Sequence, residues 1–123
     1  VSPNIRTVKL DPASISTDKN EVEKYINDPL IFHEAGKAGM GAALLRAIAD
    51  VKTKFTSFNY PVLIMHGEAD KITNPLGSKA LHAQSPGTDK ELKIWDGSFH
   101  EIFNETNKVD VINHMTAWLS ARI

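Results

Sequence analysis

The stretch PVLIMHGEADKIT, residues 61–73, decides the fold of this chain. Its first seven residues form a continuous apolar run of strand length, bounded by Pro61 and Gly67. This pattern predicts a β-strand that is buried on both faces, as strands of parallel sheets are. The turn-forming residues that follow place Asp70 in a loop at the carboxyl end of the strand, where open α/β sheets carry functional groups.

The residues after this strand repeat the pattern of helix and strand. NPLGSKALHAQ, residues 74–84, predicts a helix with Asn74 as its cap and Pro75 at its first position, and ELKIW, residues 91–95, predicts a second strand. The last segment, residues 108–123, predicts a helix whose apolar residues share one face: Val109, Ile112, Met115, Trp118 and Leu119. Strand, helix, strand and helix in this order indicate an α/β fold, with a right-handed βαβ unit and a terminal helix packed on a parallel sheet.

The first half of the chain shows fewer regular elements. Residues 1–20 are rich in turn-forming side chains and predict an extended loop. A short helix follows, with Thr17 or Asp18 as its cap, and it ends at Asp28 because a proline comes next. Residues 29–51 show apolar positions at helical spacing, with three glycines that weaken the first half of the predicted helix.

Composition excludes several classes of protein. The 123 residues carry 14 basic and 15 acidic side chains, so the formal net charge is −1 and no basic surface for nucleic acid is expected. The chain has no cysteine, and no apolar run approaches the ~18 residues of a membrane span. Because two strands alone leave unpaired edges, we expect further strands of the sheet to come from elsewhere.

Two groups suited to acid–base chemistry follow the two predicted strands. Asp70 lies after the first strand, and His100, in IWDGSFHEIFNE (residues 94–105), lies after the second. A carboxylate that accepts the Nδ1–H of a histidine fixes the tautomer and stabilises the imidazolium that forms during proton transfer. The sequence therefore predicts His100 as a general base and Asp70 as its orienting acid, with Glu68 and Glu101 as the other carboxylates nearby.

The remaining histidines carry weaker signals. His66 ends the first strand, His82 and His114 fall in predicted helices, and His33 follows the proline-led segment. No pair has the spacing of metal ligands with an acid between, so the sequence predicts neither a metal nor a cofactor.

Three blocks of the chain carry a family resemblance: STDKNEVEKYINDPLI (residues 16–31), PVLIMHGEADKIT (residues 61–73) and GSFHEIFNE (residues 97–105). In order and spacing they resemble the C-terminal half of the monoacylglycerol lipase and lysophospholipase branch of the α/β-hydrolases. The resemblance implies that residues 1–55 are the remainder of the cap and its return helix, and that residues 56–123 are the C-terminal part of the hydrolase core. It also implies that Asp70 is the acid and His100 the base of a Ser-His-Asp triad.

The nucleophile of such a triad is absent from the sequence. α/β-Hydrolases carry it in a G-x-S-x-G motif ahead of the acid and the histidine, and neither GKAGMG nor LGSKA matches that motif. We therefore expect a missing N-terminal half to supply the serine and the oxyanion hole, and we expect no hydrolase activity from this chain alone. The resemblance implies a serine hydrolase that cleaves carboxylic esters of lipids, monoacylglycerol or lysophospholipid, once both halves are together.

The resemblance also indicates residues that would contact substrate. Met40, Leu44 and Leu45 fall where relatives line a tunnel for the acyl chain, and Ile72 looks like a pocket wall, although the same residues would suit an ordinary core equally well. A cytoplasmic location, with peripheral membrane contact through the cap, is the corresponding expectation. Two alternatives stay open: a hydrolase of the same fold with another nucleophile, as in epoxide hydrolases and dehalogenases, and an inactive interaction module.

Overall fold

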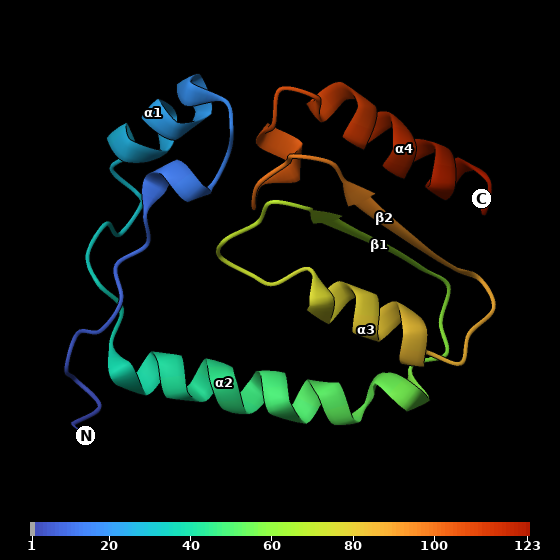
Figure 1. Cartoon of the computed structure of the whole chain (residues 1–123), viewed down its shortest axis with the longest axis horizontal. Coiled ribbons are helices and arrows are strands. Elements are labelled where there is room, and N and C mark those ends of the chain that lie inside the picture. The colour runs from blue at the N-terminus through green and yellow to red at the C-terminus, as the bar shows by residue number, and fades with distance from the viewer. Residues whose placement is uncertain (1) are drawn as a thin grey trace.

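The computed structural model describes residues 2–123 of the chain (Figure 1). In chain order its helices are α1 (Lys19–Asn27), α2 (Ala38–Thr53), α3 (Leu76–Gln84) and α4 (Lys108–Ser120). Its strands are β1 (Val62–Gly67) and β2 (Lys90–Trp95), and its short 3₁₀ turns are η1 (Pro12–Ser14), η2 (Phe55–Ser57) and η3 (Ile102–Asn104).

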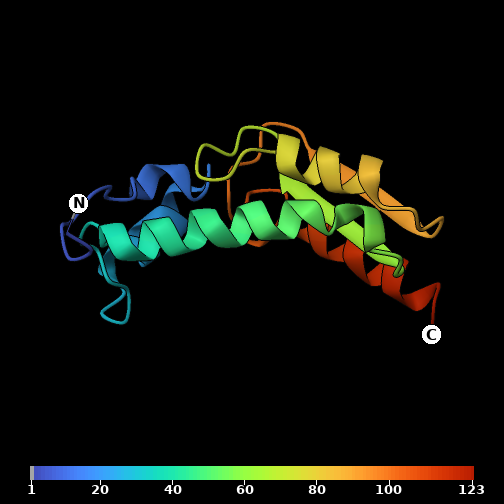
Figure 2. The same cartoon turned by 90° about the horizontal axis from the view of Figure 1, so that it is seen from below.

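Strands β1 and β2 pair in parallel, and Gly67 at the end of β1 lies opposite Trp95 at the end of β2. Helix α3 connects them, and α3 and α4 cover opposite faces of this two-stranded sheet (Figure 2). The parallel βαβ unit predicted from sequence is confirmed. The expected burial of the first strand on both faces is met in part within residues 2–123: Ile64 and Gly67 of β1 are buried, and its other four residues are half-buried.

A small core lies where β2, η3 and α4 meet. Trp95, Ile102 and Val111 are buried against one another, and Met65 of β1 packs against them. Apolar packing of this kind stabilises a fold by about 25 cal/mol for each Å² removed from water. The core holds the loop after β2 against the last helix, and so fixes the part of the chain that carries His100.

The face of α4 turned toward the sheet differs from the predicted face. It consists of residues at positions i, i+3, i+4 and i+7, which are buried or half-buried: Val111, His114, Met115 and Trp118. Three residues predicted for the buried face are instead exposed: Val109, Ile112 and Leu119. The ring of His114 packs edge-on against Trp95, with 5.7 Å between the ring centroids, so a polar side chain occupies a position that sequence patterning assigns to an apolar one.

Local capping sets two helix starts. The Asp18 carboxylate accepts a hydrogen bond from the N–H of Asn20 (2.9 Å), so α1 begins where the sequence predicts. Asn74 accepts likewise from the N–H of Leu76 (2.9 Å), although α3 begins at Leu76 and not at Pro75. The predicted Asp18 cap is confirmed. In α3 the N-cap position is Pro75, so this helix starts one residue later than expected and Asn74 bonds its first N–H from outside the cap position.

Helix α2 begins later than predicted, at Ala38 rather than at the start of residues 29–51. Backbone hydrogen bonds join Gly36 to Thr7 (2.9 Å) and to Val8 (3.1 Å). These bonds hold the residues before α2 in extended form against the N-terminal segment. The predicted longer helix is wrong because a tertiary contact uses backbone groups that a helix would need.

Helix α2 is the longest helix of the described residues, and none of its side chains is buried. Its large apolar residues are between 42% and 68% exposed: Met40, Leu44, Leu45, Ile48 and Val51. In both views α2 runs alongside the βαβ unit and joins it through η2 (Figure 1, Figure 2). Within residues 2–123, neither α2 nor any other helix has the length and apolar character to cross a membrane.

Candidate active site

Asp70 lies in the loop between β1 and α3, and its side chain is 2% exposed. Carboxylate oxygen Oδ1 accepts hydrogen bonds from the backbone N–H groups of Ile72 (2.7 Å) and Thr73 (2.9 Å). The other oxygen, Oδ2, accepts from the hydroxyl of Thr73 (2.7 Å). An aspartate side chain that accepts a hydrogen bond from the N–H two residues later closes an Asx turn. Residues 70–73 therefore form the turn that holds the Asp70 carboxylate in place.

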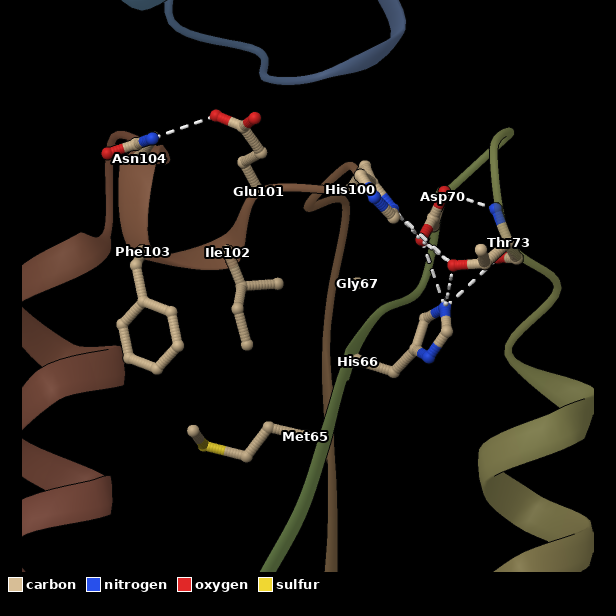
Figure 3. Close-up of a pocket in the computed structure, with 10 residues that line it drawn as sticks. All are labelled: Met65, His66, Gly67, Asp70, Thr73, His100, Glu101, Ile102, Phe103 and Asn104. Atoms are coloured by element: carbon tan, nitrogen blue, oxygen red, sulfur yellow. Dashed lines mark hydrogen bonds and ion pairs between the residues drawn. The ribbon is translucent and has the colours of Figure 1, made fainter. Parts of the chain in front are cut away.

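His100 reaches the same carboxylate from the loop after β2. Its Nδ1 lies 2.9 Å from Asp70 Oδ2 (Figure 3). When Nδ1–H donates to the carboxylate, the lone pair is on Nε2, which can then accept a proton. The side chain of His100 is 37% exposed and lines a cavity. The structure thus brings together the two residues that sequence analysis paired.

Burial raises the pKa of Asp70, but hydrogen bonds from His100, from Thr73 and from the backbone of Ile72 outweigh burial and lower the pKa from its usual 3.8 to about 2. The carboxylate is therefore charged throughout the range in which histidines ordinarily titrate. A charged acceptor is what the orientation of an imidazole and the stabilisation of an imidazolium require.

Gly67 permits the close approach of two loops: the acid loop after β1 (residues 68–75) and the histidine loop after β2 (residues 96–101). A Cβ at this position would overlap the carbonyl oxygens of Ser98 and Phe99. The same contact includes a hydrogen bond from the N–H of Ala69 to the carbonyl oxygen of Ser98 (2.9 Å). Backbone contact therefore fixes the acid loop against the histidine loop, and only glycine fits at the crossing point.

The site also contains His66, to which sequence analysis gave no role. Its Nε2 lies 3.0 Å from both the carbonyl oxygen of Thr73 and Asp70 Oδ2 (Figure 3). Its Nδ1 lies 2.8 Å from the hydroxyl of Ser78. These contacts fit one tautomer, in which Nε2–H donates to Thr73 and the Ser78 hydroxyl donates to Nδ1. His66 thereby connects β1, the acid loop and α3. The signal in the sequence that could have placed His66 in the site is its position four residues before Asp70.

A cavity of about 410 Å³ opens beside the pair. Met65, Ile102 and Phe103 form an apolar wall, and Asn104 and Thr73 contribute polar groups (Figure 3). An apolar wall with a few converging polar groups is typical of a binding site for a small organic molecule. The arrangement can hold an apolar group next to the accessible edge of the histidine.

The residues predicted to line an acyl pocket are not part of the lining of this cavity within residues 2–123. Met40, Leu44 and Leu45 are exposed on α2. Ile72 is half-buried in the acid loop, where its backbone N–H bonds Asp70. None of the four lines the cavity, and their part in substrate binding stays a prediction.

The other carboxylates considered for His100 have other partners. Glu68 accepts a hydrogen bond from the N–H of Gly97 (3.4 Å), and Glu101 accepts one from Asn104 Nδ2 (2.8 Å). In the part of the chain that the structure describes, no group of three or more His, Cys, Asp or Glu side chains is arranged to hold a metal ion. Asp70 is the carboxylate that the structure pairs with His100.

A parallel βαβ unit with an acid loop and a histidine loop at adjoining strand ends is part of an α/β-hydrolase fold. A family model described as serine aminopeptidase, S33 (Hydrolase_4), matches residues 1–107. The chain belongs to this hydrolase family.

The similar proteins and solved structures are hydrolases of the same kind. The monoglyceride lipase of Rattus norvegicus is 34% identical over 125 residues, which cover 100% of this chain and 41% of the rat protein. The solved monoacylglycerol lipase of Paleococcus ferrophilus has a TM-score of 0.87 and 27% identity, over 98% of this chain and 48% of that one. A soluble variant of the Saccharomyces cerevisiae monoglyceride lipase, in complex with a substrate analog, has a TM-score of 0.80 and 31% identity, over 97% and 44%. The chain spans less than half the length of these relatives, and the resemblance to a C-terminal portion of such hydrolases is confirmed.

Proposed function

We propose that this chain supplies the acid and the base of a serine hydrolase that cleaves carboxylic esters of lipids, a monoacylglycerol or a lysophospholipid. One observation carries the proposal: the loop-bound carboxylate of Asp70 lies 2.9 Å from His100 Nδ1, beside a cavity with an apolar wall. The rat and yeast relatives, which are named monoglyceride lipases, support this class of substrate.

The proposed reaction is acyl transfer through a serine ester. His100 Nε2 takes the proton of the serine hydroxyl as the serine oxygen attacks the ester carbonyl, while Asp70 holds the imidazole and stabilises the imidazolium. Backbone N–H groups of the other half bind the oxyanion. His100 then protonates the departing alcohol. In the second half of the reaction it takes a proton from the water that attacks the acyl-serine and gives it to the serine oxygen as the acyl–serine bond breaks, so each half of the reaction returns the histidine to its neutral form.

The serine and the oxyanion hole would come from an N-terminal half of the same enzyme, and we call the two together the assembled enzyme. Three features support this partner: the sheet of residues 2–123 stops at β1, α2 buries none of its residues, and the relatives are more than twice as long. Residues 1–55 would then be the remainder of the cap and its return helix, and residues 56–123 the C-terminal part of the core. Without the serine, this chain alone would be inactive.

The acyl chain of the substrate would lie against the apolar wall of the cavity. In the assembled enzyme, Met40, Leu44, Leu45 and Ile72 would extend that wall. Each methylene removed from water stabilises the bound state by about 0.8 kcal/mol, so a long acyl chain gains far more than a short ester. A substrate of this kind fits a cytoplasmic enzyme that contacts the membrane surface through its cap.

The experiment follows monoacylglycerol hydrolysis by the assembled enzyme, with a fluorophosphonate probe to label the serine. We expect His100→Ala to lower kcat about 10⁴-fold and to slow labelling, because the serine loses its base. Asp70→Asn should lower kcat by a similar factor, because the imidazole then takes the wrong tautomer. His82→Ala removes a histidine of α3 outside the site, so this matched control should keep the wild-type rate.

Other results would replace the proposal. Absence of both labelling and hydrolysis in the wild type would contradict a serine hydrolase. An aspartate at the nucleophile position, with turnover of an epoxide or a haloalkane, would establish another chemistry on the same fold. Full biological function in both the His100 and the Asp70 variants would indicate an interaction module.

A further inference from the structure

Glu105 follows His100 by five residues, is 1% exposed, and takes no part in the proposed reaction. Its Oε1 accepts the backbone N–H of Phe99 (2.6 Å), the residue directly before His100. Its Oε2 accepts the backbone N–H of Thr17 (3.1 Å) and also the Thr17 hydroxyl. One carboxylate therefore joins the start of the histidine loop to a segment 88 residues earlier in the chain.

Further contacts hold that earlier segment in place. The Ser16 hydroxyl donates to the carbonyl oxygen of Asn104 (2.8 Å), and the N–H of Glu101 donates to the carbonyl oxygen of Ile15 (2.8 Å). Ile15 and Ser16 are 2% and 3% exposed. Residues 15–17, which we name the docking segment, are thus packed against η3 immediately before helix α1.

Hydrogen bonds alone hold the Glu105 carboxylate, since none of the ion pairs within residues 2–123 includes it. A buried carboxylate is costly unless N–H and O–H groups are directed at it. If this contact served only to stabilise the fold, an apolar side chain of similar size would fill the space with a smaller desolvation penalty than a carboxylate. What the carboxylate adds is direction: it fixes where the Phe99 N–H and the Thr17 donors must lie.

We propose that Glu105 is a positioning residue for His100: it fixes the backbone from which the histidine extends, and it makes that position depend on the docking segment. The inference rests on the proposed function, because it takes His100 as the base. Asp70 orients the ring, and Glu105 holds the start of the loop. A displacement of about 1 Å in a catalytic group can lower a rate about 10²-fold, so release of either contact reduces proton transfer. The proposed cap remainder, residues 1–55, contains the docking segment and therefore acts on His100 through this carboxylate.

The test compares three variants of the assembled enzyme. We expect Glu105→Gln to lower kcat about 10-fold to 10²-fold with KM unchanged, because the loop shifts while the apolar wall is untouched. Thr17→Val keeps the bond from Phe99, so it should lower kcat by a smaller factor. Glu23→Gln removes an exposed carboxylate on α1 that makes no side-chain hydrogen bond in the described residues, and it should match the wild type.

Amide hydrogen exchange and NMR separate positioning from unfolding. Glu105→Gln should speed exchange of the Phe99 and Thr17 amides and weaken the downfield resonance of His100 Nδ1–H, while the amides of β1 exchange at wild-type rates. Unchanged kcat with unchanged exchange at Phe99 would overturn the inference. So would faster exchange throughout β1, because Glu105 would then only stabilise the fold.

Failure of the proposed function would be recognised separately. If the wild-type enzyme does not hydrolyse the ester, the proposed function fails, but the exchange of the Phe99 amide and the His100 resonance still report on Glu105. A change in both signals in Glu105→Gln would support its positioning of the histidine loop. Wild-type behaviour of both would refute it.

Discussion

Helices α2 and α4 both carry many apolar residues, but only α4 is packed in a core. Helix α4 places Val111, with none of its surface exposed, against Trp95 and Ile102. Helix α2 leaves Leu44 59% and Leu45 68% exposed and buries no residue. Contiguous exposed apolar faces are typical of interaction surfaces. The second half of the chain therefore builds its own core and site, whereas α2 indicates where the proposed N-terminal half would pack.

The largest effect is expected at Val111, in the packed helix α4. In the assembled enzyme we expect Val111→Asp to lower the free energy of unfolding by about 4 kcal/mol or more, because it buries a charge without a partner. Val109→Asp is the matched control, since Val109 is 65% exposed on the same helix, and it should change stability by less than about 0.5 kcal/mol. Urea unfolding measures both. Equal losses at the two positions would show that the buried face of α4 is wrong.

The contact between the two loops gives the next largest effect. Gly67→Ala should lower the free energy of unfolding by about 3 kcal/mol, because the new methyl group forces the loops apart. Gly77→Ala is the control: a Cβ there meets nothing within 4 Å, and alanine stabilises a helix by about 1 kcal/mol relative to glycine. Thermal unfolding and hydrolysis rates would be compared. Full stability and activity in Gly67→Ala would refute the described crossing.

Asp70 offers a pH-dependent test of the second half of the chain, which carries the site. Its pKa falls from 3.8 to about 2 on folding, so its stabilisation is complete above pH 3.8 and is lost as the pH falls through about 2. The shift corresponds to about 2 kcal/mol. We expect the stability of the wild type, relative to Asp70→Asn, to fall by this amount over that range in parallel urea titrations. A difference independent of pH would contradict the hydrogen bonds described for Asp70.

The smallest effect on folding is expected for changes on the exposed apolar face of α2. In the isolated chain, the double change Leu44→Lys and Leu45→Lys should alter the free energy of unfolding by less than about 0.5 kcal/mol, because both side chains are exposed. We expect the isolated chain to self-associate through the exposed apolar residues of α2, and the double change should weaken this association. Circular dichroism and sedimentation would report the two effects. Loss of helix in the double variant would mean that α2 is packed after all.

Local rules account for what could be predicted from the sequence. The apolar run of β1 and the Asp18 cap of α1 are confirmed, and the meeting of Asp70 with His100 follows from loops at the ends of parallel strands. The start of α2 could not be predicted, because a contact between Gly36 and the N-terminal segment decides it. The buried face of α4 could not be predicted either, because that helix is apolar on two sides and the position of Trp95 selects one.

The roles of His66 and Glu105 could not be predicted from the sequence, because they depend on partners that only the fold brings near. His66 is ordinary as a strand residue until Thr73 and Ser78 are placed around it. Glu105 belongs to a residue type that is almost always exposed, and its partner Thr17 lies 88 residues earlier. In both cases the functional interpretation depends on contacts that only the folded chain creates.

The most direct measurement mixes this chain with the proposed serine-bearing N-terminal half, each purified separately, and follows hydrolysis of a monoacylglycerol. We expect no hydrolysis by either half alone, and activity that appears on mixing and saturates at equal molar amounts. The same mixture prepared with His100→Ala should be inactive. Hydrolysis by this chain alone, or mixing activity that survives His100→Ala, would contradict the assignment of Asp70 and His100 as the acid–base pair of a divided serine hydrolase.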